Sequence, residues 1–157
     1  MRNLKIHKTT TPNSLSKWYK IKNPLKVILN FITIYTARYC PSLALKRALL
    51  RTTGMKIGKN TSIGLSATFD IFFPELIEIG ENCLIGYNTT ILAHEFLISE
   101  YRTGEVKIGS NVMIGANTTI LAGTTIGDNA QISAMTLVNK DIKKNELVGG
   151  IPLRQLK

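Results

Sequence analysis

The sequence is poor in the residue types on which many functional sites depend. Among 157 residues it holds two cysteines and two histidines. Cys40 and Cys83 are too few for a disulfide framework or a tetrahedral thiolate site, and we interpret both as reduced packing residues. His7 and His94 cannot form a three-histidine zinc site within one chain, so no metal is expected. The sequence also lacks a GxSxG elbow and a phosphate-binding loop with its lysine, so neither a serine hydrolase nor a nucleotide-cradling loop is expected.

Acidic residues are absent from the first sixty positions. Residues 1–60 hold 13 Lys and Arg, whereas residues 61–157 hold 7 basic and 10 acidic residues. Such an asymmetry is typical of a segment that meets an anionic surface. The segment carries no recognised nucleic-acid-reading motif, so nucleic acid is not the expected partner.

Long apolar runs are absent as well. The longest, residues 25–39, is interrupted by Lys26, Asn30 and Arg38. It is shorter than the roughly 20 apolar residues that a membrane-spanning helix needs. The first residues show no apolar core of a secretory signal. We therefore expect a cytoplasmic protein, with a peripheral contact at the inner membrane face left open.

A six-residue repeat fills the second part of the chain. A branched aliphatic residue, mostly followed by Gly or another small residue, recurs at Ile57, Ile63, Ile79, Ile85, Ile91, Ile108, Ile114, Ile120, Ile126, Ile132 and Val138. If each hexad forms one short strand and one turn, three hexads close one triangular coil with the aliphatic side chains inside. Gly, Asn and Asp suit the corners, where positive φ is often needed. The repeat predicts a mainly β parallel solenoid.

The repeat loses its phase twice. The step from Ile63 to Ile79 is two positions short of three hexads, and the step from Ile91 to Ile108 is one position short. Loops are expected in both segments, and insertions in a solenoid often build the binding face. His94 stands just before the second loop.

The first part of the chain reads as helical, so we divide the chain into a basic segment, residues 1–55, and a repeat domain, residues 56–157. Asn23 followed by Pro24 predicts a helix start, and Pro41 predicts its end. A second short helix is expected up to Gly54. Residues 1–11 are expected to be disordered or loosely attached.

The helical segment has two interpretations. Ile28, Phe31, Ile32 and Tyr35 recur at helical spacing beside basic residues within residues 17–51. This stripe could lie in an anionic membrane interface, or it could pack on the end of the solenoid as a cap.

His94 is the main candidate for chemistry, since an imidazole can act as a general base near neutral pH. The alternative interpretation is that His94 is a loop histidine with no functional role. Glu95 could orient or bind an acceptor, and Asp70 could contact an acceptor hydroxyl, but both could also be ordinary charged residues. Cys83 should point inward as a buried thiol.

From about Gly54 onward the chain resembles the hexapeptide-repeat acyltransferases, the left-handed parallel β-helix family. The resemblance rests on IGENCLIGYNTTILAHE, VKIGSNVMIGANTTILAGTTIGDN and LVNKDIKKNELVGGIPLRQLK. It is nearest to the sugar O-acetyltransferase branch, which includes maltose, galactoside and capsule acetyltransferases.

The resemblance implies a homotrimer with acetyl-CoA in the groove between neighbouring solenoids. It implies that His94 is the catalytic histidine, and that the acetyl-CoA site includes Ala116, Ala134, Asn139, Lys140 and Arg154. The sequence departs from the family at Met135, where Gly is usual, at Asn139, where Thr is usual, and at Leu153, where Ala is common.

The predicted function is acetyl transfer from acetyl-CoA to a hydroxyl or amine of a sugar or envelope-glycan precursor, directly and without an acyl-enzyme. The alternative is a non-catalytic trimeric scaffold that its basic arm docks to a membrane or a partner.

Overall fold

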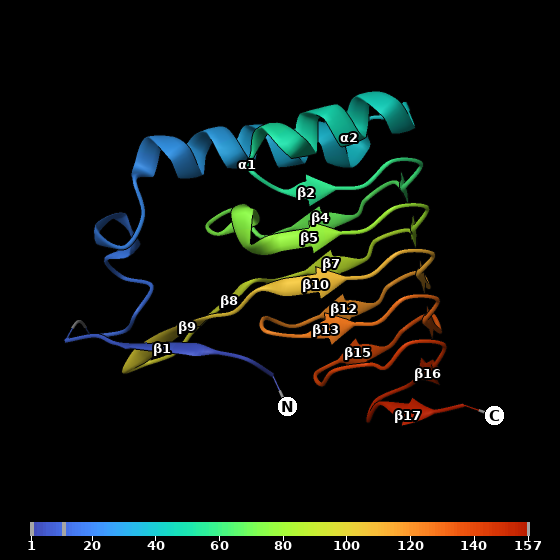
Figure 1. The fold of residues 1–157 in the computed structure, drawn as a ribbon. Coiled ribbons are helices and arrows are strands. Elements are labelled where there is room, and N and C mark those ends of the chain that lie inside the picture. Colours follow the sequence, from blue (N-terminus) through green and yellow to red (C-terminus); the bar gives the residue numbers. More distant parts are fainter. Residues whose placement is uncertain (1, 11, 157) are drawn as a thin grey trace.

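The computed structural model describes residues 2–10 and 12–156. Its body is a coil whose short strands fall in turn on three parallel sheets (Figure 1). The first sheet holds β2 (Lys56–Ile57), β5 (Ile77–Ile79), β10 (Val106–Ile108) and β13 (Thr125–Ile126). The second holds β3 (Ser62–Ile63), β6 (Leu84–Ile85), β11 (Met113–Ile114), β14 (Gln131–Ile132) and β16 (Leu147–Gly149), with β17 (Arg154–Gln155) added antiparallel. The third holds β4 (Thr68–Phe69), β7 (Thr90–Ile91), β12 (Thr119–Ile120) and β15 (Leu137–Val138). This is the parallel coil that the six-residue repeat predicts.

The aliphatic repeat residues stack in columns along the coil. In the second sheet Ile63 pairs with Ile85, Ile85 with Ile114 and Ile114 with Ile132, and each is at most 1% exposed. The columns form the core because one coil cannot bury its own apolar face and needs the next coil above it. Cys83, 2% exposed, joins this core, and burial raises the pKa of its thiol.

Asparagine and glycine have different roles at the corners, which the sequence did not separate. The left-handed backbone positions belong mainly to asparagines, such as Asn88 with φ 54° and Asn117 with φ 56°. The glycines that follow several of the buried isoleucines are needed for space instead. A Cβ placed on Gly86 would lie 2.6 Å from the backbone nitrogen of Ala116 on the next coil.

Every change of phase lies at one corner, the connection from the third sheet back to the first, which we call the third corner. Ile57 pairs with Ile79 and Ile79 with Ile108, so these two coils are four and eleven positions longer than three hexads. Ile108 pairs with Ile126 after three regular hexads. The first break is therefore an insertion of four residues, not a shortage of two. The repeat pattern did not reveal it because Phe69, not an aliphatic residue, occupies the third sheet in that coil.

A third change of phase falls inside a stretch that the repeat presented as regular. Ile142 bridges Ile126, and the step between them is two positions short of three hexads, so this corner is tighter in the last coil. The sequence pattern, in which we found two losses of phase up to Val138, did not reveal this third one.

The second insertion forms a hairpin that the N-terminus extends. β8 (His94–Phe96) pairs antiparallel with β9 (Glu100–Thr103), and β1 (Lys5–Lys8) pairs antiparallel with the other edge of β9. The prediction that residues 1–11 are disordered is thus wrong for β1, while residues 1 and 11 lie outside the described residues. A short 3₁₀ turn (Trp18–Lys20) follows β1, and another (Pro74–Leu76) lies in the first insertion.

Two helices cover the first coil, as Figure 1 shows. They are α1 (Pro24–Tyr39) and α2 (Leu43–Thr52). Asn23 caps α1 by accepting the N–H of Leu25, and Ser42 caps α2 by accepting the N–H of Leu45. The start after Asn23 and the end before Pro41 confirm the first predicted helix, and α2 confirms the second. Within the described residues no helix is long and apolar enough to cross a membrane.

The face of α1 that packs on the coil is not the predicted apolar stripe. Val27, Ile34 and Ala37 are the buried apolar residues, together with Asn30, whose side chain donates to the Ile71 carbonyl at 3.0 Å. The stripe residues Ile28, Phe31, Ile32 and Tyr35 stay exposed. The helix therefore caps the coil through one face and leaves its more apolar face outside.

Basic side chains of α2 bind the open carbonyls of the first coil. Lys46, 1% exposed, donates to the carbonyls of Ile63 and Gly64 at 3.1 and 3.0 Å. Arg47 donates to Thr61 at 3.0 Å, and Arg51 donates to Ile57 at 2.9 Å. These carbonyls have no preceding coil to pair with, so the cations satisfy groups that would otherwise be costly to bury. Part of the basic excess therefore serves the cap.

Candidate active site

The two insertions at the third corner bring His94 and Asp70 together. Asp70 directly follows β4, and β8 begins at His94, shortly after the end of β7 in the coil above. Because Phe69 pairs with Ile91 in the third sheet, the residues that follow them leave the coil side by side. The Nδ1 atom of His94 is hydrogen-bonded to Oδ2 of Asp70.

The carboxylate of Asp70 is enclosed by donors. Its side chain is 0% exposed. Its Oδ1 accepts the N–H groups of Phe72 and Phe73, each at 2.9 Å, and Oδ2 accepts the N–H of Ala93 at 2.8 Å. Burial alone would raise the pKa of Asp70, but the hydrogen bond and charge of His94 and the backbone donors outweigh it, so the pKa lies below its ordinary value. Asp70 is therefore an ionised group at neutral pH.

His94 lies among three phenylalanines. The ring centroids of Phe72, Phe73 and Phe96 are 5.1, 5.6 and 4.6 Å from that of His94, and the His94 side chain is 13% exposed. The apolar rings fix the imidazole in one orientation. Since Nδ1 is bound to Asp70, Nε2 is the atom that remains to take a proton. The arrangement suits a general base whose tautomer and orientation are set by a buried carboxylate.

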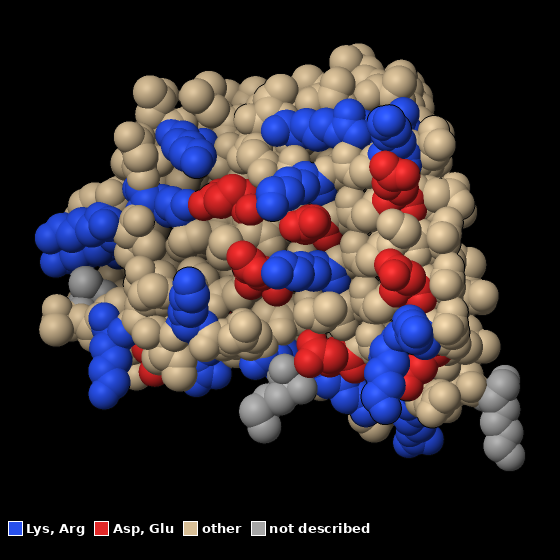
Figure 2. Space-filling view, viewed as in Figure 1, with Lys and Arg blue, Asp and Glu red and all other residues tan. Residues whose placement is uncertain are grey.

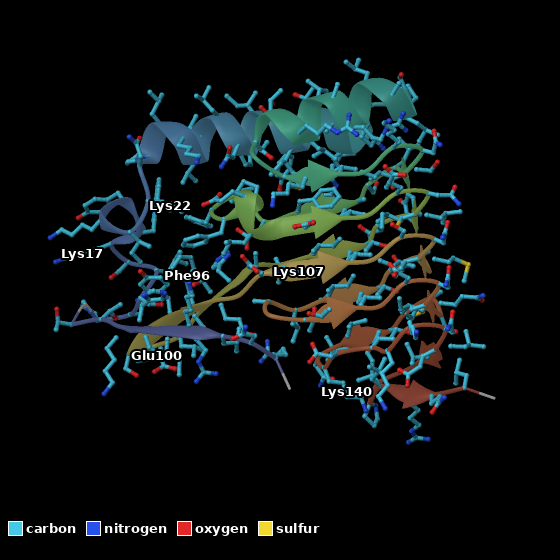
Figure 3. The ribbon with its side chains drawn as sticks, viewed as in Figure 1. Lys17, Lys22, Phe96, Glu100, Lys107 and Lys140 are labelled. Atoms are coloured by element: carbon cyan, nitrogen blue, oxygen red, sulfur yellow. The ribbon has the colours of Figure 1, made fainter. Side chains whose placement is uncertain are left out.

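The N-terminal arm, residues 2–10 and 12–22, packs against both insertions from outside. Trp18 packs edge-on against Phe72 at 5.7 Å, and the Lys22 ammonium lies 4.4 Å from the ring centroid of Phe73. His7 stacks on Tyr101 at 4.5 Å. In Figure 3, Lys22 and Phe96 lie at the same side of the molecule. Nothing in the arm's sequence indicated these contacts, because they join residues far apart in the chain without any repeat.

The structure gives Asp70 and Glu95 partners within the chain. Asp70, predicted as an acceptor contact, lies behind His94 and cannot reach an acceptor from its buried position. Glu95, also predicted to bind the acceptor, forms an ion pair with Arg2 in which both side chains are 20% exposed.

The residues expected at acetyl-CoA lie away from His94 in the same chain. Ala116 and Ala134 are stacked at the corner between the second and third sheets, where the Met135 N–H donates to the Ala116 carbonyl at 2.8 Å. Met135 is 70% exposed and has φ 55°.

The remaining members of the expected acetyl-CoA set lie at the far end of the coil. Asn139 and Lys140 are at the third corner of the last coil, and Lys140 lies well away from Phe96 in Figure 3. Lys140 and Arg154 line one cavity of about 230 Å³ at this end. Within one chain, His94 and the two alanines therefore lie at different corners, whereas Lys140 and Arg154 lie close together.

Within residues 2–10 and 12–156, no three His, Cys, Asp or Glu side chains gather into a metal-binding group. The fold and the site together define a hexapeptide solenoid that carries a histidine–carboxylate pair at one corner.

Comparisons with known proteins identify the family to which this solenoid belongs. Residues 105–140 match the family model "Bacterial transferase hexapeptide (six repeats)", and residues 76–92 match "Hexapeptide repeat of succinyl-transferase". The chain is 54% identical over 155 residues to "Putative acetyltransferase YvoF" of Bacillus subtilis (strain 168), covering 98% of this chain and 90% of that protein.

Solved structures share the fold. A hexapeptide-repeat acetyltransferase of Vibrio cholerae O1 biovar eltor complexed with acetyl coenzyme A has a TM-score of 0.70 at 22% identity, with 92% of this chain and 90% of that chain covered. Galactoside acetyltransferase in complex with coenzyme A has a TM-score of 0.65 at 22% identity, with 92% and 84% covered. The chain belongs to the hexapeptide-repeat acetyltransferases, which confirms the family that the repeat motifs resemble.

Proposed function

We propose that this protein transfers an acetyl group from acetyl-CoA directly to a hydroxyl or amine of a sugar or envelope-glycan precursor in the cytoplasm. The observation that carries the proposal is the His94–Asp70 pair at the third corner. Relatives of similar fold bind acetyl coenzyme A or coenzyme A, and a galactoside acetyltransferase is among them, which supports the donor and the acceptor class.

The chemistry needs one base and one aligned thioester. His94 Nε2 takes the proton of the acceptor group as that group attacks the thioester carbonyl. The C–S bond then breaks, and the coenzyme A thiolate leaves with the proton that His94 returns. The charge of Asp70 stabilises the imidazolium that exists between the two proton transfers. Asp70 is thus a positioning residue in this proposal. For Glu95 to bind an acceptor, the acceptor would first have to displace Arg2.

The donor site proposed here needs more than one copy of the chain. His94 and the stacked Ala116 and Ala134 lie at different corners, so a groove that contains all three is formed when the third corner of one copy faces the alanine corner of another. This supports an oligomer such as the trimer that the family resemblance implies. The side chains of Lys140 and Arg154 offer positive charge for the phosphates of the donor at the C-terminal end of that groove.

Calorimetry of acetyl-CoA binding, with the oligomer mass measured alongside, tests the donor. Micromolar binding by a trimer is expected. The exposed side chain of Met135 stands beside the alanine corner, so Met135→Gly is the matched variant. Binding by Met135→Gly and not by the wild type would mean that the groove is closed, which would favour the scaffold function.

An acceptor screen then tests the chemistry. We would offer sugars, glycan fragments and lipid-linked intermediates with radiolabelled acetyl-CoA. His94→Ala should bind acetyl-CoA as the wild type does and lose at least about 10²-fold in transfer rate. Full activity in His94→Ala would refute His94 as the base, and failure to label any acceptor of these classes would refute the acceptor assignment.

A further inference from the structure

An extended apolar face lies on the outside of the helical cap. Its members are all 40–65% exposed, and we call them the outer face: Leu25, Ile28, Leu29, Phe31, Ile32, Tyr35 and Tyr39 of α1, with Leu43 and Leu45 of α2. Contiguous apolar patches of this kind are uncommon on a protein that works alone in water and mark an interaction site.

Packing of the fold does not require this face. The contact of α1 with the coil is made by Val27, Ile34 and Ala37 on its opposite side. In Figure 2 the rim above α1 and α2 carries neither acidic nor basic side chains, and basic side chains lie just below it. Figure 1 shows that α1 lies flat across the end of the coil, so the face is presented broadside.

The charge around the outer face has one sign. Residues 1–60 contain no acidic residue. Two acids of the neighbouring coil, Glu75 and Glu78, form ion pairs with Lys22 and Lys56. Lys17, Lys20 and Lys26 are exposed near the start of α1, at positions not used by the carbonyl cap. A flat apolar helix face with lysines at its border matches a bilayer interface rich in anionic lipid.

The same charge disfavours a second copy as the occupant. Two outer faces placed against each other would bring two acid-free ends together, so lysine would face lysine in a dehydrated contact. We propose that the outer face docks this protein on the surface of an anionic lipid bilayer, with the apolar side chains in the headgroup region and Lys17, Lys20 and Lys26 at the lipid phosphates.

The proposal also has a consequence for the acceptor. The helix layer is about 10 Å thick and adjacent strands are about 4.8 Å apart, so the histidine corner of the second coil would lie about 20 Å from the membrane. That distance suits the headgroup of a membrane-anchored glycan. Docking itself does not depend on acetyl transfer.

Vesicle flotation of the full-length protein tests the docking. We expect binding to vesicles that contain phosphatidylglycerol, weak binding to pure phosphatidylcholine, and release at high salt. Ile28→Glu/Ile32→Glu should weaken binding by more than about 100-fold, because two side chains leave the apolar region and two anions enter it. Ile98→Glu, at a 74% exposed position on the hairpin, is the control and should bind as the wild type does.

Single charge reversals test the electrostatic part. Lys26→Glu should weaken binding at least about fivefold, whereas Lys144→Glu, exposed near the opposite end of the coil, should change it little. Circular dichroism of each variant confirms that it is folded.

The proposal would be overturned if the wild type did not bind anionic vesicles, or if Ile28→Glu/Ile32→Glu and Ile98→Glu lost vesicle binding equally. It would also be overturned if neither the wild type nor the double variant bound lipid and the double variant had half the oligomer mass of the wild type. The last result would assign the face to a second copy. Acetyl-CoA binding measured on the same samples separates a failure of docking from a failure of the proposed activity.

Discussion

The repeat region and the N-terminal segment are stabilised by different kinds of contact. In the repeat region each residue meets its equivalent one coil away, as Ile114 meets Ile85 and Ile132. In the N-terminal segment the contacts join unlike partners, such as Lys46 with the Ile63 carbonyl or Trp18 with Phe72. A repeated contact is encoded by a local pattern, whereas a single contact is encoded by two distant positions. The functional corner lies where the two regions meet, because Asp70 and His94 stand in insertions of the coil and the arm packs around them.

The largest expected effect comes from breaking the pair at that corner with Asp70→Asn. An amide cannot accept the hydrogen bonds of the carboxylate from all its donors, and the variant has no charge to stabilise a histidine cation. We expect a loss in transfer rate on the order of 10²-fold, with unchanged acetyl-CoA binding, and a loss of about 2–3 kcal/mol in the free energy of unfolding at pH 7.

The pH dependence of the free energy of unfolding tests whether Asp70 stabilises the fold as an ionised carboxylate. The pKa of Asp70 is below its ordinary value in the folded protein, so its contribution is complete above the ordinary aspartate pKa and is lost as pH falls through the folded pKa. The wild type should therefore lose its advantage over Asp70→Asn in acid. A stability difference that stays constant down to the lowest pH of folding, followed by denaturant titration, would contradict the ionised pair.

The difference between repeated contacts and single long-range contacts explains which features could be predicted from the sequence. The columns of Ile, the corners and the start of α1 could be read from the sequence, because each depends on residues at short, fixed spacing. His94 was found from its place beside an insertion. The role of Asp70 was not found, because it depends on how the insertions stack. Because Phe69 was not recognised as a repeat position, the sequence did not show that it pairs with Ile91, and so did not place Asp70 beside His94.

The orientation of α1 could not be read either. Its apolar stripe left two interpretations open, a membrane interface or a packing face, and the coil contacts the opposite side with Val27, Ile34 and Ala37. Side-chain pattern alone reports an apolar face and does not say what covers it.

The second prediction removes a contact of the N-terminal segment. Lys46→Met keeps the volume of the side chain but leaves the carbonyls of Ile63 and Gly64 without donors at a buried edge. We expect a loss of about 1–3 kcal/mol in the free energy of unfolding. Lys26→Met, at an exposed position on α1, is the control and should change it by less than about 0.5 kcal/mol. Equal effects in the two variants would show that the carbonyl cap does not stabilise the coil.

The third prediction tests the stacking of coils in the repeat region. Gly86→Ala places a Cβ 2.6 Å from the Ala116 backbone nitrogen, so the neighbouring coils must separate. We expect a loss of about 1–3 kcal/mol from this overpacking, measured by chemical denaturation. Gly150→Ala is a different case, since its Cβ meets nothing nearer than 3.5 Å and the cost there comes from φ 88° alone. A neutral Gly86→Ala would mean that the coil spacing is softer than the contact distance implies.

The smallest expected effect is a gain of stability at Met135, the position where the repeat departs from its own pattern. The equivalent positions in the coils before it are Asn88 and Asn117, and all three have φ between 54° and 56°. A methionine is strained in this left-handed conformation, which asparagine and glycine adopt at lower cost. Because the Met135 side chain is 70% exposed, its replacement removes little packing. Met135→Asn should therefore raise the free energy of unfolding by about 1 kcal/mol, and Met135→Gly by less because glycine also gains freedom in the unfolded chain. Thermal unfolding of the three proteins at one concentration measures the order. If Met135→Asn is less stable than the wild type, the methionine is held by a contact that one copy of the chain does not contain, and the corner next to Ala134 would then be buried against a neighbouring subunit.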